Sequence, residues 1–405
     1  MTSSKAMSVV VLGSDEHWGL GILRSLGRLS IPVYTASFNP EAPAFSSRYC
    51  TGKIILSDEE NFTERLLQRL LHVGRQIGRG SLLIPTSDVG TAFVADRAND
   101  LDEWFMFPAQ SSDLVRSLCS KKQMYYLAKK SNFPTPEATF PQCKQDVLDF
   151  LKTALFPIVI KAVYGWHLQH RNIKSLSIVN SEQELVKKYE EMEDPQEPNL
   201  MLQEYIPGGD NAVWMFNGYF NERSDCLFGI TGRKIRMWPV HRGVTSLGIC
   251  MKNETVEKAI CKFMKTIGYR GIVDIGLRYD ARDGQYKVLD INPRIGATFR
   301  LFVDENGMDC ARALYYDMTG EPVGASRVSP DGRKWFVEDL DLGSSVLCFM
   351  DGSLSLKQWV NSYRGIQEAA YLALDDPLPF LRMLGNRLGG PGHIVNALDE
   401  RRQTR

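Results

Sequence analysis

The sequence predicts a multidomain protein that combines α/β and α+β folds. Apolar β-runs alternate with helical patterns in the first quarter of the chain, which is typical of a parallel sheet covered by helices. Further on, two runs of alternating apolar residues flank an Asp-Gly turn and predict an antiparallel hairpin. At 405 residues, the chain exceeds the roughly 100–200 residues of one domain. We therefore expect two or three packed units.

Composition excludes several classes of protein. Lys+Arg and Asp+Glu are both 48, so the net charge of zero gives no support for nucleic acid as the main partner. No apolar run approaches the ~20 residues that a membrane helix needs, and the N-terminus enters a short strand directly. Eight cysteines without a C-x-x-C pair argue against a zinc site or a disulfide framework. We expect a cytoplasmic protein without a membrane partner.

The chain begins with an apolar run at Ser8–Leu12, a turn, a helical pattern and a second β-run at Ile31–Ala36. This order predicts the start of a parallel sheet. A dinucleotide fingerprint would need G-x-G-x-x-G at the turn, but Gly13, Gly19 and Gly21 have the wrong spacing. NAD binding is therefore not expected.

Acidic residues follow two of the predicted parallel strands. Asp15 comes after the first strand, and Asp88 comes after the strand at Ser81–Pro85. Open α/β sheets bind ligands at the carboxyl ends of their strands, so both side chains are candidates to face one crevice. Capping of the following helix explains each residue equally well.

The predicted hairpin carries polar side chains on one face. Its strands are expected at Ile272–Tyr279 and Tyr286–Ile291. Asp290, Asn292 and Arg294 alternate along the second strand and its end, so they point to the same side. Carboxylate and amide oxygens suit Mg²⁺, and a guanidinium suits phosphate or carboxylate. The alternative is a surface hairpin with a polar outer face.

This hairpin, with its acid-x-Asn-Pro-Arg ending and a predicted helix before it at Thr255–Gly268, resembles the metal-binding hairpin of the ATP-grasp superfamily, in particular the carboxylate–amine ligase branch. The resemblance covers nearly the whole chain. It implies four parts: a pre-ATP-grasp α/β domain at 1–115, a small ATP-grasp subdomain at 116–200, a large subdomain with the hairpin at 201–325, and a C-terminal extension at 326–405.

The resemblance also implies a nucleotide site. Lys121 and Lys161 would contact the nucleotide, Lys161 at the α- and β-phosphates. The residues themselves agree, because a lysine at a helix start favours an anionic partner and a lysine that closes an apolar strand needs one. Solvated lysines are the alternative for Lys121. The family's adenine hinge corresponds to Gln203, Glu204, Tyr205 and Ile206, and its ribose contact to Asp210.

The family's metal ligands correspond to Asp274, Asp290 and Asn292. Family members carry the first-strand ligand at positions that match Asp274 or Gly276, and glycine has no side chain to offer, so Asp274 is our choice. A glycine-rich lid is expected after Lys161. Residues 162–175 depart from that pattern, since they contain the single Gly165 with His167, His170, Arg171 and Lys174.

The implied reaction joins a carboxylate to an amine. ATP would convert the carboxylate into an acylphosphate, with Mg²⁺ as cofactor and Mn²⁺ as an alternative. Arg294 and Lys161 would stabilise charge on the transferring phosphoryl group. Asp15, Asp88, Arg233 and Arg300 are substrate candidates, although a basic strand edge explains Arg233 and a surface position explains Arg300.

We therefore expect a ligase with small-molecule acid and amine substrates. Two alternatives stay open: a bicarbonate-activating carboxyphosphate enzyme, and a non-catalytic nucleotide-binding regulator on the same fold. The C-terminal extension is expected to wrap the core or to make a contact in a homodimer.

Overall fold

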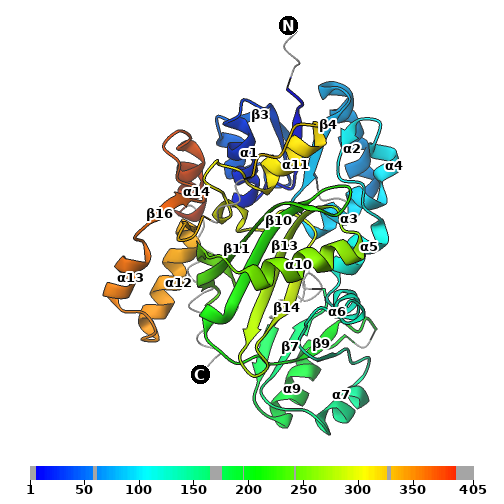
Figure 1. Ribbon diagram of the computed structural model, residues 1–405, viewed down its shortest axis with the longest axis vertical. Coiled ribbons are helices and arrows are strands. Elements are labelled where there is room, and N and C mark those ends of the chain that lie inside the picture. The colour runs from blue at the N-terminus through cyan, green and yellow to red at the C-terminus, as the bar shows by residue number, and fades with distance from the viewer. Residues whose placement is uncertain are drawn as a thin grey trace.

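The computed structural model describes residues 6–57, 62–164, 176–194, 196–240, 243–325 and 330–388. These residues form three sheets of five, four and seven strands (Figure 1). The five-stranded sheet lies at one end of the molecule, the four-stranded sheet at the other, and the seven-stranded sheet between them. In the part of the chain that is described, no helix has the length and apolar character needed to cross a lipid bilayer.

The first sheet is parallel and has the order β3-β2-β1-β4-β5, as the N-terminal pattern predicted. Because β1 and β4 are neighbours, the residues that follow them meet at one edge of the sheet. The strands are β1 Val9–Leu12, β2 Val33–Ser37, β3 Cys50–Ile55, β4 Ser81–Pro85 and β5 Phe105–Met106. The helices are α1 His17–Gly27, α2 Phe62–Ile77, α3 Asp88–Asp96 and α4 Ala98–Leu101, with the 3-10 helix η1 Pro43–Ser46.

The four-stranded sheet has the order β6-β9-β7-β8 and is antiparallel. Its strands are β6 Ala138–Thr139, β7 Ile158–Ala162, β8 Leu176–Val179 and β9 Leu200–Glu204. Helices α7 Lys144–Leu151 and α9 Glu182–Met192 pack on it through buried residues such as Val147 and Leu185. Helices α5 Ser112–Cys119 and α6 Lys121–Lys130 lead into this sheet from the first one.

The seven-stranded sheet has the order β14-β13-β10-β11-β12-β15-β16. One face of this sheet packs against α10. The other face packs against α11 and against α1 of the first unit, through a separate apolar cluster (Figure 1). Its strands are β10 Val213–Phe220, β11 Cys226–Trp238, β12 Val244–Cys250, β13 Gly271–Asp280, β14 Gln285–Asn292, β15 Lys334–Phe336 and β16 Ile366–Ala369. The associated helices are η2 Asp210–Ala212, α10 Glu254–Ile267, η3 Phe299–Leu301 and α11 Cys310–Met318.

The predicted hairpin is confirmed as β13 and β14. Asp274 pairs with Asn292 and Gly276 pairs with Asp290, so these residues share one face of the sheet. One irregularity, between Gly276 and Leu277, separates this polar part from the tip of the hairpin. The polar face therefore has the register that strand periodicity predicted.

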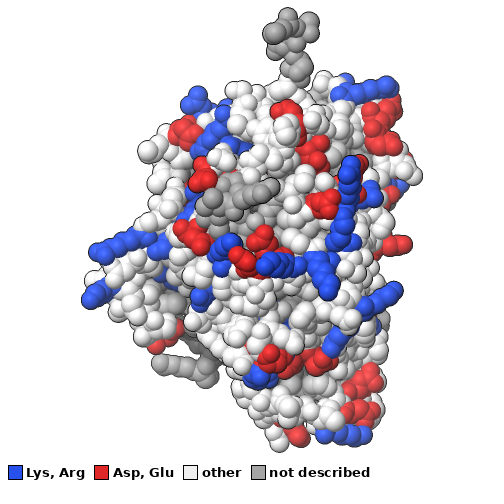
Figure 2. Space-filling view, viewed as in Figure 1, with Lys and Arg blue, Asp and Glu red and all other residues white. Residues whose placement is uncertain are grey.

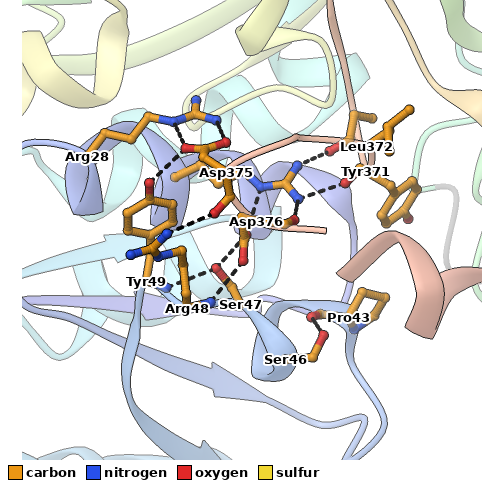
Figure 3. Close-up of polar contacts among 12 residues, drawn as sticks. Arg28, Pro43, Ser46, Ser47, Arg48, Tyr49, Tyr371, Leu372, Asp375 and Asp376 are labelled. Atoms are coloured by element: carbon orange, nitrogen blue, oxygen red, sulfur yellow. Dashed lines mark hydrogen bonds and ion pairs between the residues drawn. The ribbon is translucent and has the colours of Figure 1, made fainter. Parts of the chain in front are cut away.

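The C-terminal extension packs on both the central sheet and the N-terminal unit. Strands β15 and β16 continue the seven-stranded sheet, and α12 Glu338–Met350, α13 Leu356–Ser362 and α14 Leu378–Leu388 flank it. Asp375 and Asp376 then insert into a socket of the N-terminal unit (Figure 3). We call this the Asp375–Asp376 socket; it consists of Arg24, Arg28, Ser47, Arg48 and Tyr49. The extension thus wraps the core, which is one of the two outcomes that we expected.

Candidate active site

Lys161 carries a buried ammonium that has no partner among the described residues. It lies next to the end of β7, where it pairs with Met201 of β9, and it is 7% exposed. Among the described residues, it makes neither a hydrogen bond nor an ion pair. Burial, and to a smaller extent the charge of Lys121, lower the pKa of Lys161 to about 8, and the charge of Asp290 opposes that change. Lys121, at the start of α6, and Asp290, on β14, therefore lie close to Lys161 although they belong to different elements.

Asp290 is the matching carboxylate without a partner. It is half-buried on the polar face of β14 and makes no hydrogen bond or ion pair within the described ranges. Its negative charge raises the pKa of Lys161, Lys234 and Arg294, so all three cations lie within electrostatic range of Asp290. A ligand that carries both signs of charge could satisfy an ammonium and a carboxylate that interact but do not pair.

Arg294 is held in one orientation by three contacts. Its Nε donates to Asp88 Oδ1 at 2.6 Å, Nη1 donates to the Ile295 carbonyl at 3.1 Å, and Nη2 donates to Asn292 Oδ1 at 3.3 Å. Asp88 is the first residue of α3, where Ser87 caps the helix. Asp88, which follows β4, therefore orients Arg294 at the end of the hairpin. These two candidate site residues form an ion pair with each other.

Asp274 lies deeper than Asp290 on the same face. Its Oδ2 accepts a hydrogen bond from Asn292 Nδ2 at 3.2 Å, and Gly296 lies so close that a Cβ there would approach its Oδ2 to 2.3 Å. Burial raises the pKa of Asp274, Arg294 and Lys234 oppose that rise, and Asp290 adds to it. Asp274 is thus positioned to hold the amide of Asn292.

The donor set suits a magnesium ion bound together with phosphate. Mg²⁺ is usually held by one or two carboxylates and by substrate phosphates, with waters completing its shell. Asp290 and Asn292 offer a carboxylate and an amide oxygen on one face, and a Cβ at Gly276 would have no neighbour nearer than Asp290 Cβ at 4.0 Å, so there is space beside them. Within the described ranges, no group of three or more His, Cys, Asp and Glu side chains could hold a metal without such help.

Lys234, and not Arg233, faces this site. Lys234 donates to the Gly243 carbonyl at 2.9 Å, and its pKa is lowered by burial but raised by Asp274, Asp290 and Asp210. Arg233 points to the opposite side of β11, where its guanidinium lies 5.5 Å from the centre of the Trp214 ring. Trp214 belongs to the cluster under α10. The sequence offered Arg233 or its neighbour Lys234 as the residue near the substrate, and the register of β10, β11 and β13 puts Lys234 on the face of Asp274.

Arg300 and Asp15 are bound within the protein. The guanidinium of Arg300 is buried, where its Nε and Nη2 donate to Glu368 at 2.8 and 2.7 Å and its Nη1 to Asp309. Arg300 is therefore not a surface residue. Its guanidinium is engaged by two carboxylates of the protein, and not held open for a substrate. Asp15 accepts from Ser37 Oγ at 2.5 Å and Asn39 N at 2.8 Å, so it fastens the loop after β2 at the crevice edge.

The predicted adenine hinge follows β9 and is tied to the hairpin. Arg278 donates through Nε to the Ile206 carbonyl at 2.9 Å and through Nη2 to the Gly208 carbonyl. The Glu204 carboxylate accepts from Arg282 at 2.5 Å, so it faces the hairpin tip. Gln203 and Ile206 are buried, Tyr205 is half-buried, and Asp210 begins η2 near Lys234. The structure thus leaves the Ile206 carbonyl and the Glu204 side chain engaged.

Sequence reasoning missed Arg278, although a signal for it existed. Arg278 continues the alternation of Asp274 and Gly276 along β13, so strand periodicity places it on the polar face. The predicted lid with Gly165, His167, His170, Arg171 and Lys174 lies outside the described residues.

Known proteins share this architecture. No model of a known protein family matches the chain. A D-aspartate ligase from Enterococcus faecium (strain Aus0004) is 24% identical over 323 residues, which are 76% of this chain and 76% of that protein. The structure of an L-amino acid ligase from Bacillus licheniformis aligns with a TM-score of 0.59 and 15% identity over 78% of this chain and 75% of that one. The biotin carboxylase domain of a Hydrogenobacter thermophilus 2-oxoglutarate carboxylase, in complex with MgADP, ADP and bicarbonate, aligns with a TM-score of 0.62 and 17% identity, over 79% and 71%.

Proposed function

We propose that this chain, which has the ATP-grasp fold and groups with the carboxylate–amine ligases of that fold, uses ATP and Mg²⁺ to join a carboxylate to an amine. The acid would attack the γ-phosphorus of ATP, so that ADP leaves and an acylphosphate forms. The amine would then attack the acyl carbon, and phosphate would leave. The D-aspartate and L-amino acid ligases among the relatives support amino acids as the substrate class.

One observation supports this proposal above all: Lys161 and Asp290 interact electrostatically, and neither side chain has a hydrogen-bond or ion-pair partner among the described residues. A buried ammonium without a partner is costly, so it points to an anion that arrives with the ligand. A carboxylate without a partner points to a cation. A triphosphate that carries a magnesium ion brings both.

The chain's own residues have separable tasks in this reaction. Asp290 and Asn292, with Asp274 as the third predicted ligand, would hold Mg²⁺, which when bound neutralises phosphate oxygens. Lys121 and Lys161 would hold the phosphates from the side of α6 and β7. Arg294 is already oriented by Asp88, so it could stabilise charge on the transferring phosphoryl group without reorganising.

Lys234 approaches the same space from β11. It lies on the large sheet, where the charges of Asp274 and Asp290 act on it. There it would neutralise the acyl phosphate as that group forms.

A second candidate is activation of bicarbonate, since one structural relative was solved with that anion. In that case carboxyphosphate would replace the acylphosphate. The third candidate is a nucleotide-binding regulator without turnover, and Gly276 favours it, because this position on the polar face supplies no side chain for a metal.

The test is phosphate release from ATP with Mg²⁺, measured with D- and L-amino acids in pairs and, separately, with bicarbonate. We expect release that depends on an amino acid and an amine together. Release with bicarbonate alone would establish the second candidate. ATP binding without release under any mixture would establish the regulator, and failure to bind ATP would overturn the nucleotide site itself.

A further inference from the structure

Asn217 of β10 is a buried amide whose polar atoms have no hydrogen-bond partner. The residue is 0% exposed, and neither Nδ2 nor Oδ1 bonds to any of the described residues. All other residues of β10 are apolar, aromatic or glycine, so an apolar side chain would be expected at this position as well. Because a buried amide without partners destabilises the fold, its presence needs an explanation.

The register of the seven-stranded sheet places Asn217 beside two predicted metal ligands. Asn217 lies directly opposite Asp274 of β13, and Asp274 lies directly opposite Asn292 of β14. The three strands are neighbours in the middle of the molecule (Figure 1). Directly opposite residues on antiparallel strands share a face, with Cβ atoms about 4.5–5.5 Å apart. The Asp274 carboxylate thus stands between two amides, one on each neighbouring strand.

One of these two amides already holds the carboxylate. Asn292 donates from Nδ2 to Asp274 Oδ2 at 3.2 Å, and its Oδ1 accepts from Arg294 Nη2 at 3.3 Å. Gly296 closes one side of Asp274, because a Cβ there would lie 2.3 Å from Oδ2. Burial raises the pKa of Asp274 and the Asn217 amide opposes that rise, so Asn217 lies within reach of the carboxylate.

We propose that Asn217 is a positioning residue of the candidate active site, whose amide holds Asp274 in place when Asn292 binds Mg²⁺. The inference rests on the proposed function, since Asn292 and Asp274 are ligands only in a chain that binds magnesium with a nucleotide. An amide group is planar, so Asn292 cannot turn its Oδ1 toward a metal without moving the Nδ2 that holds Asp274. Rotation about the last side-chain torsion of Asn217, which is soft, would bring its Nδ2 to the carboxylate from the opposite strand.

The test is ADP binding by the full chain, measured by calorimetry while the concentration of Mg²⁺ is varied. Side chains that orient metal ligands typically contribute about 10–100-fold to metal affinity. The Mg²⁺ concentration that gives half-maximal ADP binding should therefore rise about 10–100-fold in Asn217→Leu. ADP binding in EDTA should stay the same, because Lys121 and Lys161 are untouched. Asn217→Thr keeps a donor and suits a strand, so its rise should be smaller.

Stability separates this role from a purely structural one. Without nucleotide, Asn217→Leu should unfold at the same urea concentration as the unmodified chain or at a higher one, because an unpaired buried amide is removed. Thr35→Val is the matched control. Thr35 of β2 is likewise 0% exposed, and its hydroxyl makes no hydrogen bond within the described ranges, but it lies in the five-stranded sheet. Its replacement should leave the magnesium requirement unchanged.

Two results would overturn the inference and leave the proposed function intact. One is an unchanged magnesium requirement in Asn217→Leu. The other is a fall in its urea midpoint together with weaker ADP binding in EDTA, which would show that Asn217 supports the fold as a whole. If Mg²⁺ has no effect on ADP binding by the unmodified chain, the proposed function fails and the inference fails with it.

Discussion

Two cation-rich regions of this molecule differ in how their charges are satisfied. In the Asp375–Asp376 socket, Arg24 is 2% exposed and donates four hydrogen bonds, to the side chain and carbonyl of Asp376 and to the carbonyls of Ala370 and Tyr371 (Figure 3). In the candidate active site, Lys161 is similarly buried and has no partner among the described residues. Positive and negative side chains are interspersed over the visible surface of the molecule (Figure 2).

The difference separates structure from function. A buried cation with a full set of acceptors contributes to the folded state and loses stability when one partner is removed. A buried cation without acceptors costs stability, and the cost is offset only when an anionic ligand arrives. The number of satisfied hydrogen bonds therefore distinguishes the two kinds of site better than the number of charges.

The largest effect is expected in the socket. Arg24→Met would leave the buried Asp376 carboxylate with fewer donors, so the free energy of unfolding should fall by about 3–5 kcal/mol in urea denaturation. Arg79→Met is the control, because Arg79 pairs with Glu103 on the surface and should contribute about 0–1 kcal/mol. Equal losses in the two variants would remove the distinction between the regions.

Lys161→Met should reverse this pattern. Phosphate release should fall about 100–1000-fold, because a cation on the transferring group is lost. The free energy of unfolding without nucleotide should stay the same or rise, since a costly charge is removed. Lys130→Met, an exposed substitution at the end of α6, should change neither quantity. A large loss of stability in Lys161→Met would show a structural role instead.

The pH dependence of stability should carry the signature of Lys161. Its pKa is lowered from 10.5 to about 8 by burial, so between these values the unfolded chain binds more protons than the folded chain. Relative to Lys161→Met, the unmodified chain should gain up to about 3 kcal/mol as the pH rises from 8 to 10.5. Below pH 8 the difference should be constant. A difference that does not change across this window would contradict the burial of an unpaired ammonium.

The smallest expected effect tests the two neighbouring cations of β11. Lys234→Met should reduce phosphate release about 10–100-fold, because a charged donor to the site is lost. Arg233→Met should change it less than about threefold, since its guanidinium lies over Trp214 on the other face. The ratio of the two rates measures which side of the strand faces the reaction, and a larger loss in Arg233→Met would invert our assignment.

Local patterns predicted much of this architecture. Strand periodicity was sufficient to place Asp290 and Asn292 on one face, because both lie on a regular strand next to its partner. The parallel order at the N-terminus and the hairpin were also predicted from apolar runs and turns. Each of these features depends on residues that are close in the sequence.

Other features depended on contacts that no local pattern contains. The choice between Arg233 and Lys234 needed the side of β11 that faces the site, and the pairing of β11 with β12 becomes irregular directly after Lys234. Arg300 looked available because its partner Glu368 is 68 residues away, and Arg24 and Asp376 are 352 residues apart. Opposite charges at such separations cannot be matched from one sequence.

Arg278 fixes the bend that follows β9. By holding the carbonyls of Ile206 and Gly208, it keeps the bend after β9 in one shape before any nucleotide arrives. A flat base entering beside that bend would meet a wall that is already ordered, so little conformational entropy would be lost on entry. An ordered bend of this kind would discriminate among bases by the shape of their edges, without a change in its own conformation.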